Sequence, residues 1–233
     1  MGRNRGIVEV GGAYPEVTIR PFNWTERQQI FIDLVLDDKN QLMFCSSPAG
    51  TGKTLLSAYC SLKLLIDKKI DKIIYVRNPV ESCSGRGLGF IKGDTGEKLE
   101  PYIAPLHDNL NKLLDSHSLK IVEKLGNIEA VPLGFCKGRT FDNAIIIVDE
   151  AEDFSFQDLR LILTRLGKKS KMLIIGDDKQ ANLKEGKFSL MIDIFNNPEA
   201  RSKGVQTFKF GAKDIMRNSL IQYLVAEIDK NIV

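Results

Sequence analysis

The chain contains few of the residues that build metal centres. Its 233 residues include only four cysteines and two histidines. No CxxC pair is present, and no cysteine and histidine cluster has the spacing of zinc ligands. We therefore expect no structural zinc site and interpret the cysteines as small apolar core residues. These residues are Cys45, Cys60, Cys83 and Cys136.

Long apolar runs and an excess of one charge are missing as well. No stretch approaches the roughly 18 apolar residues of a membrane-spanning helix, and the first residues lack the apolar core of a secretory signal. We expect a cytoplasmic protein with reduced thiols and no membrane partner. The 33 basic and 30 acidic residues leave a formal charge of +3, which decides nothing about nucleic acid.

Short apolar runs alternate with helical stretches along the chain. The runs at 42–45, 73–76, 144–148, 172–175 and 205–210 have strand length, and several lack the alternation of half-exposed strands. Apolar residues recur at helical spacing in 25–35, behind Thr25 as N-cap, and in 55–65, 98–125 and 212–228. This order predicts an α/β fold with a mostly parallel sheet covered by helices on both faces. We expect a partly disordered extension over 1–16 and one domain over 17–233, with a helical insertion around 98–126.

The segment 47–54, Ser-Pro-Ala-Gly-Thr-Gly-Lys-Thr, follows the first predicted strand and opens a predicted helix. It nearly matches the phosphate-binding loop G-x-x-x-x-G-K-[ST]. Gly50 and Gly52 let the backbone curl so that its N–H groups face phosphate oxygens. Lys53 is then placed for the β- and γ-phosphates, and the Thr54 hydroxyl for Mg²⁺. Ser47 stands where the pattern asks for glycine, and we expect it to cost the loop some backbone freedom.

Acidic and amide side chains follow two further predicted strands. Asp149 and Glu150 come directly after the run 144–148, at the strand end where open parallel sheets bind ligands. Asp149 is placed to hold Mg²⁺ through water, and Glu150 to polarise an attacking water. After the run 172–175, Asp177 and Gln180 are candidates for holding the loop and for sensing a γ-phosphate.

The order of motifs resembles the PhoH family of P-loop ATPases, relatives of superfamily 1 helicases with a RecA-like core. The resemblance covers roughly 25–223. It rests on 25–28, 47–54, 77–81, 88–90, 93–94, 97–98, 101–102, 138–140, 149–151, 163–167, 176–177 with Gln180, and 214–217. Two departures are Glu152, where the family has a Gln or similar after Asp-Glu-Ala, and a longer stretch at 82–87. The second departure puts any substrate contact of that stretch in doubt.

The resemblance implies ATP and Mg²⁺ as cofactors and a hydrolytic reaction. It implies that Gln28 reads adenine, that Gln180 is the sensor, and that Arg217 is an arginine finger able to complete the site of a neighbouring subunit. The implied catalytic residues are Lys53, Glu150, Gln180 and Arg217, and the implied metal residues are Thr54 and Asp149. The implied nucleotide-binding residues are Thr25, Gln28, Pro48, Ala49, Gly50, Thr51, Gly52, Lys53, Thr54 and Leu55.

Nucleic acid and a homo-oligomeric ring are the expected partners. One RecA-like core supplies half of a nucleotide clamp, and the family resemblance favours a hexamer. Arg77, Arg86 and Arg139 are candidates for binding RNA or single strands, together with two lysine clusters at 68–69 and 168–171, although no aromatic residues interleave them for stacking. Two other functions stay open: a nucleotide-dependent switch or scaffold with little turnover, and a small-molecule P-loop kinase.

Overall fold

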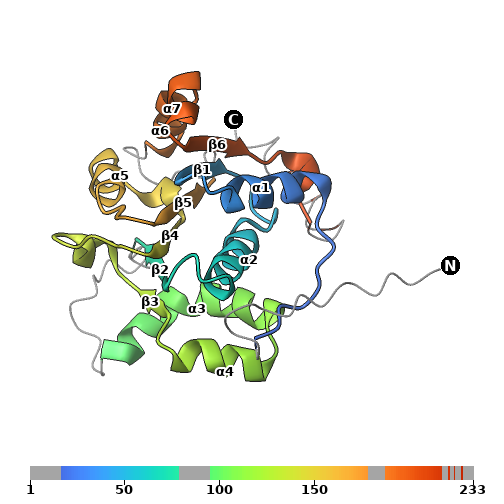
Figure 1. Ribbon diagram of the computed structural model, residues 1–233. Helices are drawn as coiled ribbons and strands as arrows, with labels where there is room; N and C mark the ends of the chain where they lie inside the picture. The colour runs from blue at the N-terminus through green and yellow to red at the C-terminus, as the bar shows by residue number, and fades with distance from the viewer. Residues whose placement is uncertain are drawn as a thin grey trace.

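A parallel sheet forms the centre of the protein in a computed structural model that describes residues 17–78, 95–177 and 187–216 together with 220, 223 and 227. Its strand order is β3-β2-β4-β5-β1-β6, and every neighbouring pair is parallel (Figure 1). This confirms the predicted α/β fold with a parallel sheet. The strands are β1 (Leu42–Ser46), β2 (Lys72–Arg77), β3 (Ile128–Ala130), β4 (Ala144–Asp149), β5 (Lys171–Gly176) and β6 (Val205–Lys209).

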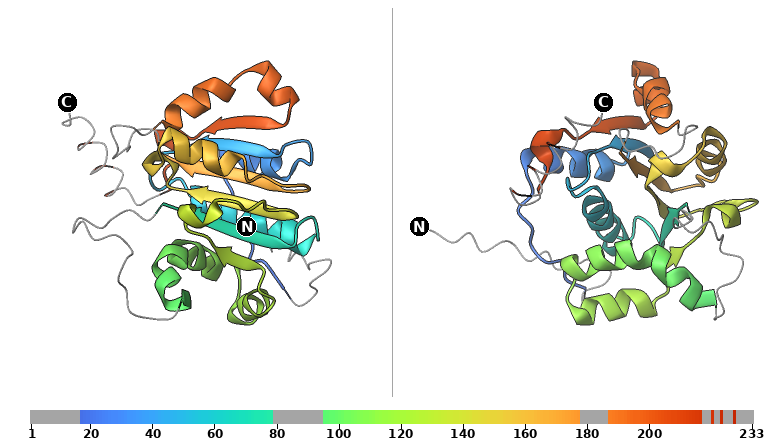
Figure 2. Two further views of the ribbon diagram at one scale, coloured as in Figure 1. Left: turned by 90° about the vertical axis from the view of Figure 1, so that its left-hand side faces the viewer. Right: turned by 180° about the vertical axis from the view of Figure 1, so that it is seen from behind.

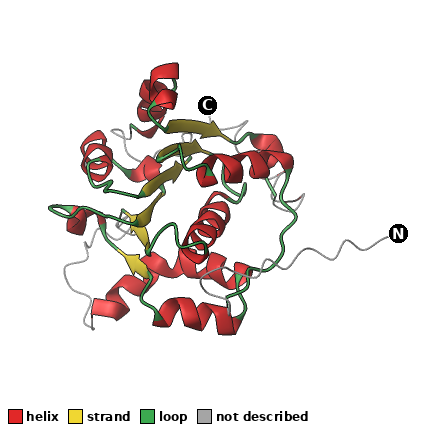
Figure 3. Cartoon of the chain, in the orientation of Figure 1, coloured by secondary structure: helices red, strands yellow, loops and turns green. Residues whose placement is uncertain are grey.

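Helices cover both faces of this sheet. Helices α1 (Glu26–Leu36) and α2 (Lys53–Ile66) lie on one side, and α5 (Phe156–Leu163) lies on the other (Figures 1 and 3). Helix α6 (Phe188–Phe195) packs on β1 and β6. The remaining helices are α3 (Thr95–Leu113), α4 (Ser116–Lys124) and α7 (Pro198–Ser202), with 3-10 turns at Leu133–Cys136, Ala151–Asp153 and Ala212–Asp214.

The apolar strands divide their side chains between two cores. On β1, Cys45 packs with Leu56 of α2 in one cluster, whereas Phe44 packs with Phe188 of α6 in the other. The views in Figure 2 show the sheet running between these two layers. All residues of β4 and β5 are buried, which explains why their sequences are continuous apolar runs rather than alternating ones.

The helical region predicted at 98–125 is two helices instead of one. Helix α3 ends at Leu113, and Asp115 starts α4 because its side chain accepts a hydrogen bond from the N–H of Ser118 at 2.7 Å. The leucine stripe predicted within this region is buried, as expected. Its members are Leu106, Leu110, Leu113 and Leu114.

Two further predictions needed correction. Strand β3, with the sequence Ile-Glu-Ala, has no apolar run and was not predicted. The final helix does not begin at 212, because Asp214 accepts from the N–H of Gly211 at 2.7 Å and Met216 donates its N–H to Gly50 at 2.9 Å. Leu220 and Tyr223 are helical, and the extension predicted over 1–16 lies outside the described residues.

The described cysteines are core residues, as predicted. Cys45, Cys60 and Cys136 are buried and free, and burial raises the pKa of each thiol. Cys83 lies outside the described residues. Within the described part of the chain, no helix combines the length and the apolar character needed to span a membrane.

The strand order brings the predicted site residues to one edge of the sheet. Ser46 at the end of β1 is paired in register with Gly176 of β5, and Arg77 of β2 with Asp149 of β4. Strand β5 separates β1 from β4. The phosphate loop and the acidic strand end therefore lie two strands apart at the carboxyl edge, where parallel sheets bind ligands.

Candidate functional site

The phosphate loop runs from the end of β1 to the first residue of α2. Gly50 and Gly52 have φ values of 91° and 87°, in the left-handed region that glycine adopts without steric cost. Gly52 is also the N-cap of α2, and no side chain bonds to the helix N-terminus there. The amide groups of this helix end are therefore free of a side-chain cap, which suits an anion.

Ser47 fits the loop without the backbone cost expected from the sequence. It is not among the described residues with positive φ. Its N–H donates to the Gly176 carbonyl at 2.9 Å, and its hydroxyl donates to Pro48 at 3.1 Å and contacts the Thr51 hydroxyl. The Ser47 side chain therefore ties the loop to itself, and its backbone N–H ties the loop to β5.

Lys53 and Gln28 both contact the loop backbone. The ammonium of Lys53 lies 3.5 Å from the Ser47 carbonyl. The Gln28 side chain accepts from the N–H of Thr25 and donates to the carbonyl of Thr51, each at 3.1 Å. Gln28 thus joins the start of α1 to the phosphate loop, and the Thr25 hydroxyl caps α1 by accepting from the N–H of Gln28.

An aromatic cluster lies beside this junction. Trp24 stacks on Phe22 with ring centroids 5.0 Å apart, and its centroid is also 5.0 Å from that of Tyr59 on α2. Trp24 is the single tryptophan of the chain. Its position directly before Thr25 gives the site an intrinsic fluorescent reporter.

Thr54 and Asp149 meet across the sheet edge. The Thr54 hydroxyl donates to Asp149 Oδ2 at 3.2 Å, and the Tyr75 hydroxyl donates to the same oxygen at 2.6 Å. Asp149 is 2% exposed, and this burial raises its pKa. A hydroxyl and a carboxylate side by side are the hard oxygen donors that Mg²⁺ prefers, so the pair fits the predicted metal site.

Glu150 is held in a strained and accessible position. Its φ and ψ are 54° and 50°, a left-handed conformation that costs a non-glycine residue on the order of 1 kcal/mol. Its carboxylate is 34% exposed and lies 3.4 Å from Nη2 of Arg77. Water can therefore reach Glu150. Arg77 is paired beside it, and its predicted contact with nucleic acid stays a prediction.

Glu152 connects the ends of β4 and β5. It is 4% exposed, and its Oε2 accepts from the N–H of Asp177 at 3.0 Å. Burial raises the pKa of Glu152 to about 8, with Glu150 adding to the rise. A raised pKa favours the protonated carboxyl, which has a donor beside its acceptor oxygen and in this respect resembles the amide of glutamine. This accounts for Glu152 at the position where the resemblance expects glutamine.

The sequence did not indicate that Tyr75 belongs to the site or that Glu152 accepts a hydrogen bond from Asp177. Tyr75 lies within an apolar strand, so its spacing indicates only a core residue. Three predicted site residues, Gln180, Arg217 and Arg86, lie outside the described residues.

The basic residues proposed for nucleic acid have partners within the chain. Arg139 pairs with Glu129 at 2.8 Å and covers the ring of Phe141 at 4.8 Å. Lysines of the two sequence clusters meet at a cavity of about 290 Å³ at the amino edge of the sheet. There Lys69 pairs with Asp38 at 2.7 Å, and Lys171 donates to the carbonyls of Asp37 and Asn40.

Sequence comparisons match the chain to PhoH and PhoH-like proteins of several bacteria. The chain is 34% identical to a PhoH-like protein of Synechocystis sp. over 89% of its own length and 62% of the relative. It is 37% identical to a PhoH-like protein of Bacillus subtilis over 82% and 59%, and 32% identical to Protein PhoH of Escherichia coli over 93% and 61%. The chain thus spans about three fifths of the length of these curated relatives.

A structural comparison found the Hef helicase domain of Pyrococcus furiosus, with a TM-score of 0.45, 11% identity, and coverage of 81% of this chain and 38% of that chain. The family described as PhoH-like protein matches residues 19–229. That match covers nearly the whole chain and includes the phosphate loop, the acidic strand end and the bonds that join them. We conclude that the chain belongs to the PhoH-like protein family.

Proposed function

We propose that this protein binds ATP with Mg²⁺ and hydrolyses it, and that hydrolysis is coupled to binding or unwinding RNA or single-stranded nucleic acid. The observation that carries the proposal is the bond between Thr54 and Asp149. It joins α2, the helix that begins where the phosphate loop ends, to the acidic end of β4. Glu150, one residue further, faces accessible space beside the same junction.

The roles of the chain's own groups follow from their positions. The amides of the loop and the ammonium of Lys53 neutralise charge on the β- and γ-phosphates. Thr54 and Asp149 are the residues that would hold Mg²⁺, which when bound would neutralise charge on the phosphates. Glu150 accepts a proton from the attacking water, because its carboxylate is the exposed one of the pair. Asp149 is buried and accepts hydrogen bonds from Thr54 and Tyr75.

Two observations support a nucleic-acid partner. Phe135 is 72% exposed, and an exposed aromatic ring is a platform on which bases stack. Lys137 and Arg139 follow it within four positions and supply positive charge for phosphates. An exposed aromatic ring and basic residues thus occur together at this turn.

A ring of identical subunits completes the proposal. A single core supplies one half of a nucleotide-binding site, and a neighbouring subunit would supply the other half. A surface for such a neighbour is the outer face of α6, which exposes two large apolar residues. These residues, Leu190 and Ile194, are 43% and 45% exposed and lie one helical turn apart. Subunit packing over this face is the arrangement that the proposal favours, with a hexamer as the expected size.

Phosphate release measured with and without single-stranded RNA tests the proposed function. We expect Mg²⁺-dependent release of phosphate from ATP that RNA stimulates. Nucleotide binding without release would favour the switch or scaffold. Transfer of phosphate to a small acceptor, with little release to water, would favour the kinase.

A further inference from the structure

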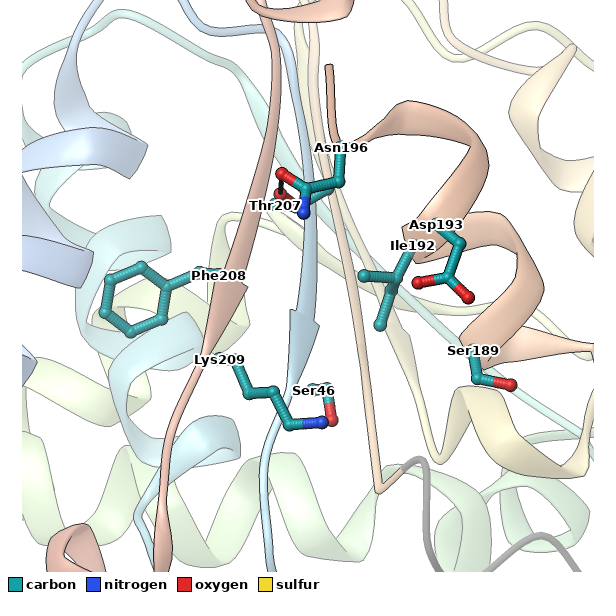
Figure 4. Close-up of a pocket in the computed structure, with 8 residues that line it drawn as sticks. All are labelled: Ser46, Ser189, Ile192, Asp193, Asn196, Thr207, Phe208 and Lys209. Atoms are coloured by element: carbon teal, nitrogen blue, oxygen red, sulfur yellow. Dashed lines mark hydrogen bonds between the residues drawn. The ribbon is translucent and has the colours of Figure 1, made fainter.

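A second cavity lies beside the phosphate loop. It is on the face of the sheet that α6 covers, opposite to the face covered by α2. It has a volume of about 380 Å³ and lies between α6 and the carboxyl ends of β1 and β6 (Figure 4). Six of its eight lining residues are polar or charged. They are Ser46, Ser189, Asp193, Asn196, Thr207 and Lys209, with Ile192 and Phe208 completing the wall.

One end of this cavity combines a cation with an unsatisfied hydroxyl. Ser46 is 1% exposed, and its hydroxyl is buried without a hydrogen-bond partner. Lys209 is paired in register with Ser46 on the neighbouring strand, and its ammonium points toward the Ser46 hydroxyl (Figure 4). Buried hydroxyl groups normally have partners, so the Ser46 hydroxyl has a donor to offer to a ligand atom that reaches this end of the cavity. An ammonium beside a hydroxyl donor is a setting that suits a phosphate oxygen.

The other end has a different chemistry. Asp193 and Ser189 lie one turn apart on α6 and line the cavity. The Asn196 oxygen accepts from the Thr207 hydroxyl and from Arg201, both at 3.1 Å, which leaves its amide nitrogen on the cavity side (Figure 4). A carboxylate repels a second anion but accepts hydrogen bonds from hydroxyl groups. The complementary ligand is therefore anionic at one end and hydroxylated at the other.

We propose that this cavity binds a ribose phosphate unit, with the phosphate at Lys209 and Ser46 and the ribose hydroxyls at Asp193. Its volume lies within the roughly 300–1,000 Å³ of small-ligand sites. The unit has two sources with this chemistry, a free sugar phosphate and the backbone of an RNA strand. Only the RNA source rests on the proposed function. Ser46 directly precedes Ser47, so an occupant contacts the strand that carries the phosphate loop.

The test uses the full chain carrying Lys53→Ala, so that the phosphate loop contributes less to the binding of sugar phosphates. Ribose 5-phosphate and orthophosphate are titrated and followed by calorimetry. We expect Lys209→Ala to weaken both ligands by about tenfold or more, as the loss of a charged hydrogen bond does. Asp193→Ala should weaken ribose 5-phosphate and leave orthophosphate unchanged or stronger. Lys203→Ala, which changes an exposed lysine on the turn after α7, is the matched control and should change neither.

The outcomes separate the proposal from its rivals. If Lys209→Ala and Asp193→Ala both bind ribose 5-phosphate as the parent does, the assignment is overturned. Equal binding of the two ligands, without an effect of Asp193→Ala, would leave a plain anion site and overturn the ribose assignment. Displacement of ribose 5-phosphate by a trinucleotide of RNA supports the proposal with a strand as the source, and binding without displacement supports a free sugar phosphate. A failure of ATP hydrolysis would sink the proposed function but would not change these titrations.

Discussion

The backbone N–H of Met216 donates a hydrogen bond to the carbonyl of Gly50 at 2.9 Å. The segment after β6 is thereby fastened to the phosphate loop of the same chain. Arg217 is the next residue in the sequence. Arg217 itself lies outside the described residues, and its role as a finger for the neighbouring subunit stays a prediction.

Mixing inactive subunits tests which loop Arg217 serves. Arg217→Ala should bind ATP and lose hydrolysis by up to about 10³-fold, the loss expected for an arginine finger. Mixed with Lys53→Ala, it should regain no activity if the finger acts within one chain. Activity that returns in mixed oligomers would instead place Arg217 at an interface. Size-exclusion chromatography of differently tagged subunits checks that mixed oligomers form.

Lys53→Ala should abolish turnover and weaken ATP binding. The ammonium neutralises phosphate charge that the loop amides meet only in part. Quenching or enhancement of Trp24 fluorescence during titration with ATP measures binding, because Trp24 stacks next to the residue that caps α1. Lys63→Ala, on the same helix, is the matched control. Normal hydrolysis by Lys53→Ala would remove the basis for the phosphate-loop assignment.

Glu150→Gln should keep ATP binding and slow the hydrolysis of bound ATP by at least about a hundredfold, the lower end for loss of a general base. The amide occupies the same space and keeps the left-handed backbone, so the loss reports on proton transfer. Single-turnover measurements with saturating ATP separate binding from chemistry. If binding is lost and the rate on bound ATP is kept, the carboxylate has a structural role and the base lies elsewhere.

Glu152→Gln should stabilise the protein at alkaline pH. Burial raises the pKa of Glu152 from its ordinary 4.5 to about 8, so over this range the unfolded chain releases a proton that the folded chain retains. The free energy of unfolding therefore falls as pH rises from about 5 to about 8, by up to a few kcal/mol. The glutamine variant lacks this loss and keeps the acceptor for the Asp177 N–H.

Urea unfolding of both proteins at several pH values measures this difference. The gap should widen from pH 5 to pH 8 and then level off. Glu123→Gln, at an exposed position of α4, serves as the control and should show no such gap. A constant difference at all pH values would show that Glu152 is not protonated in the folded protein.

Phe135→Ala should weaken binding of single-stranded RNA. Stacking of one base is worth about 1–3 kcal/mol, which corresponds to a factor of about 5 to 150 in affinity. Arg139→Ala should instead flatten the dependence of log affinity on log salt by about 0.7, the value for one phosphate contact. Fluorescence anisotropy at several salt concentrations distinguishes the two effects. An unchanged affinity in both variants would move the RNA site away from this turn.

The sequence was informative where a local pattern determines the structure. The cap of α1 at Thr25, the buried run before Asp149 and the glycines of the loop all have signatures within a few residues. Strand β3 has only three residues and a central Glu129, so it lacks such a signature. The strand exists because it pairs with β2, and pairing between distant segments cannot be seen in either segment alone.

The contacts within the site were hidden for the same reason. The bond between Tyr75 and Asp149 joins two strands, and the bond between Met216 and Gly50 joins two segments that lie far apart in the sequence. Each side chain or amide has an ordinary local environment in the sequence. Only the folded sheet edge shows that Asp149 accepts from both Thr54 and Tyr75.

The close approach of Glu152 to Gly176 limits how this sequence can vary. A Cβ atom added to Gly176 would lie 2.5 Å from Oε2 of Glu152 and 3.1 Å from the amide nitrogen of Ala151. A methyl group at 176 therefore displaces the carboxyl that bonds to Asp177. An alanine at 176 therefore requires the Glu152 side chain to move or to be shortened, so the glycine is a condition for the bond that joins the ends of β4 and β5.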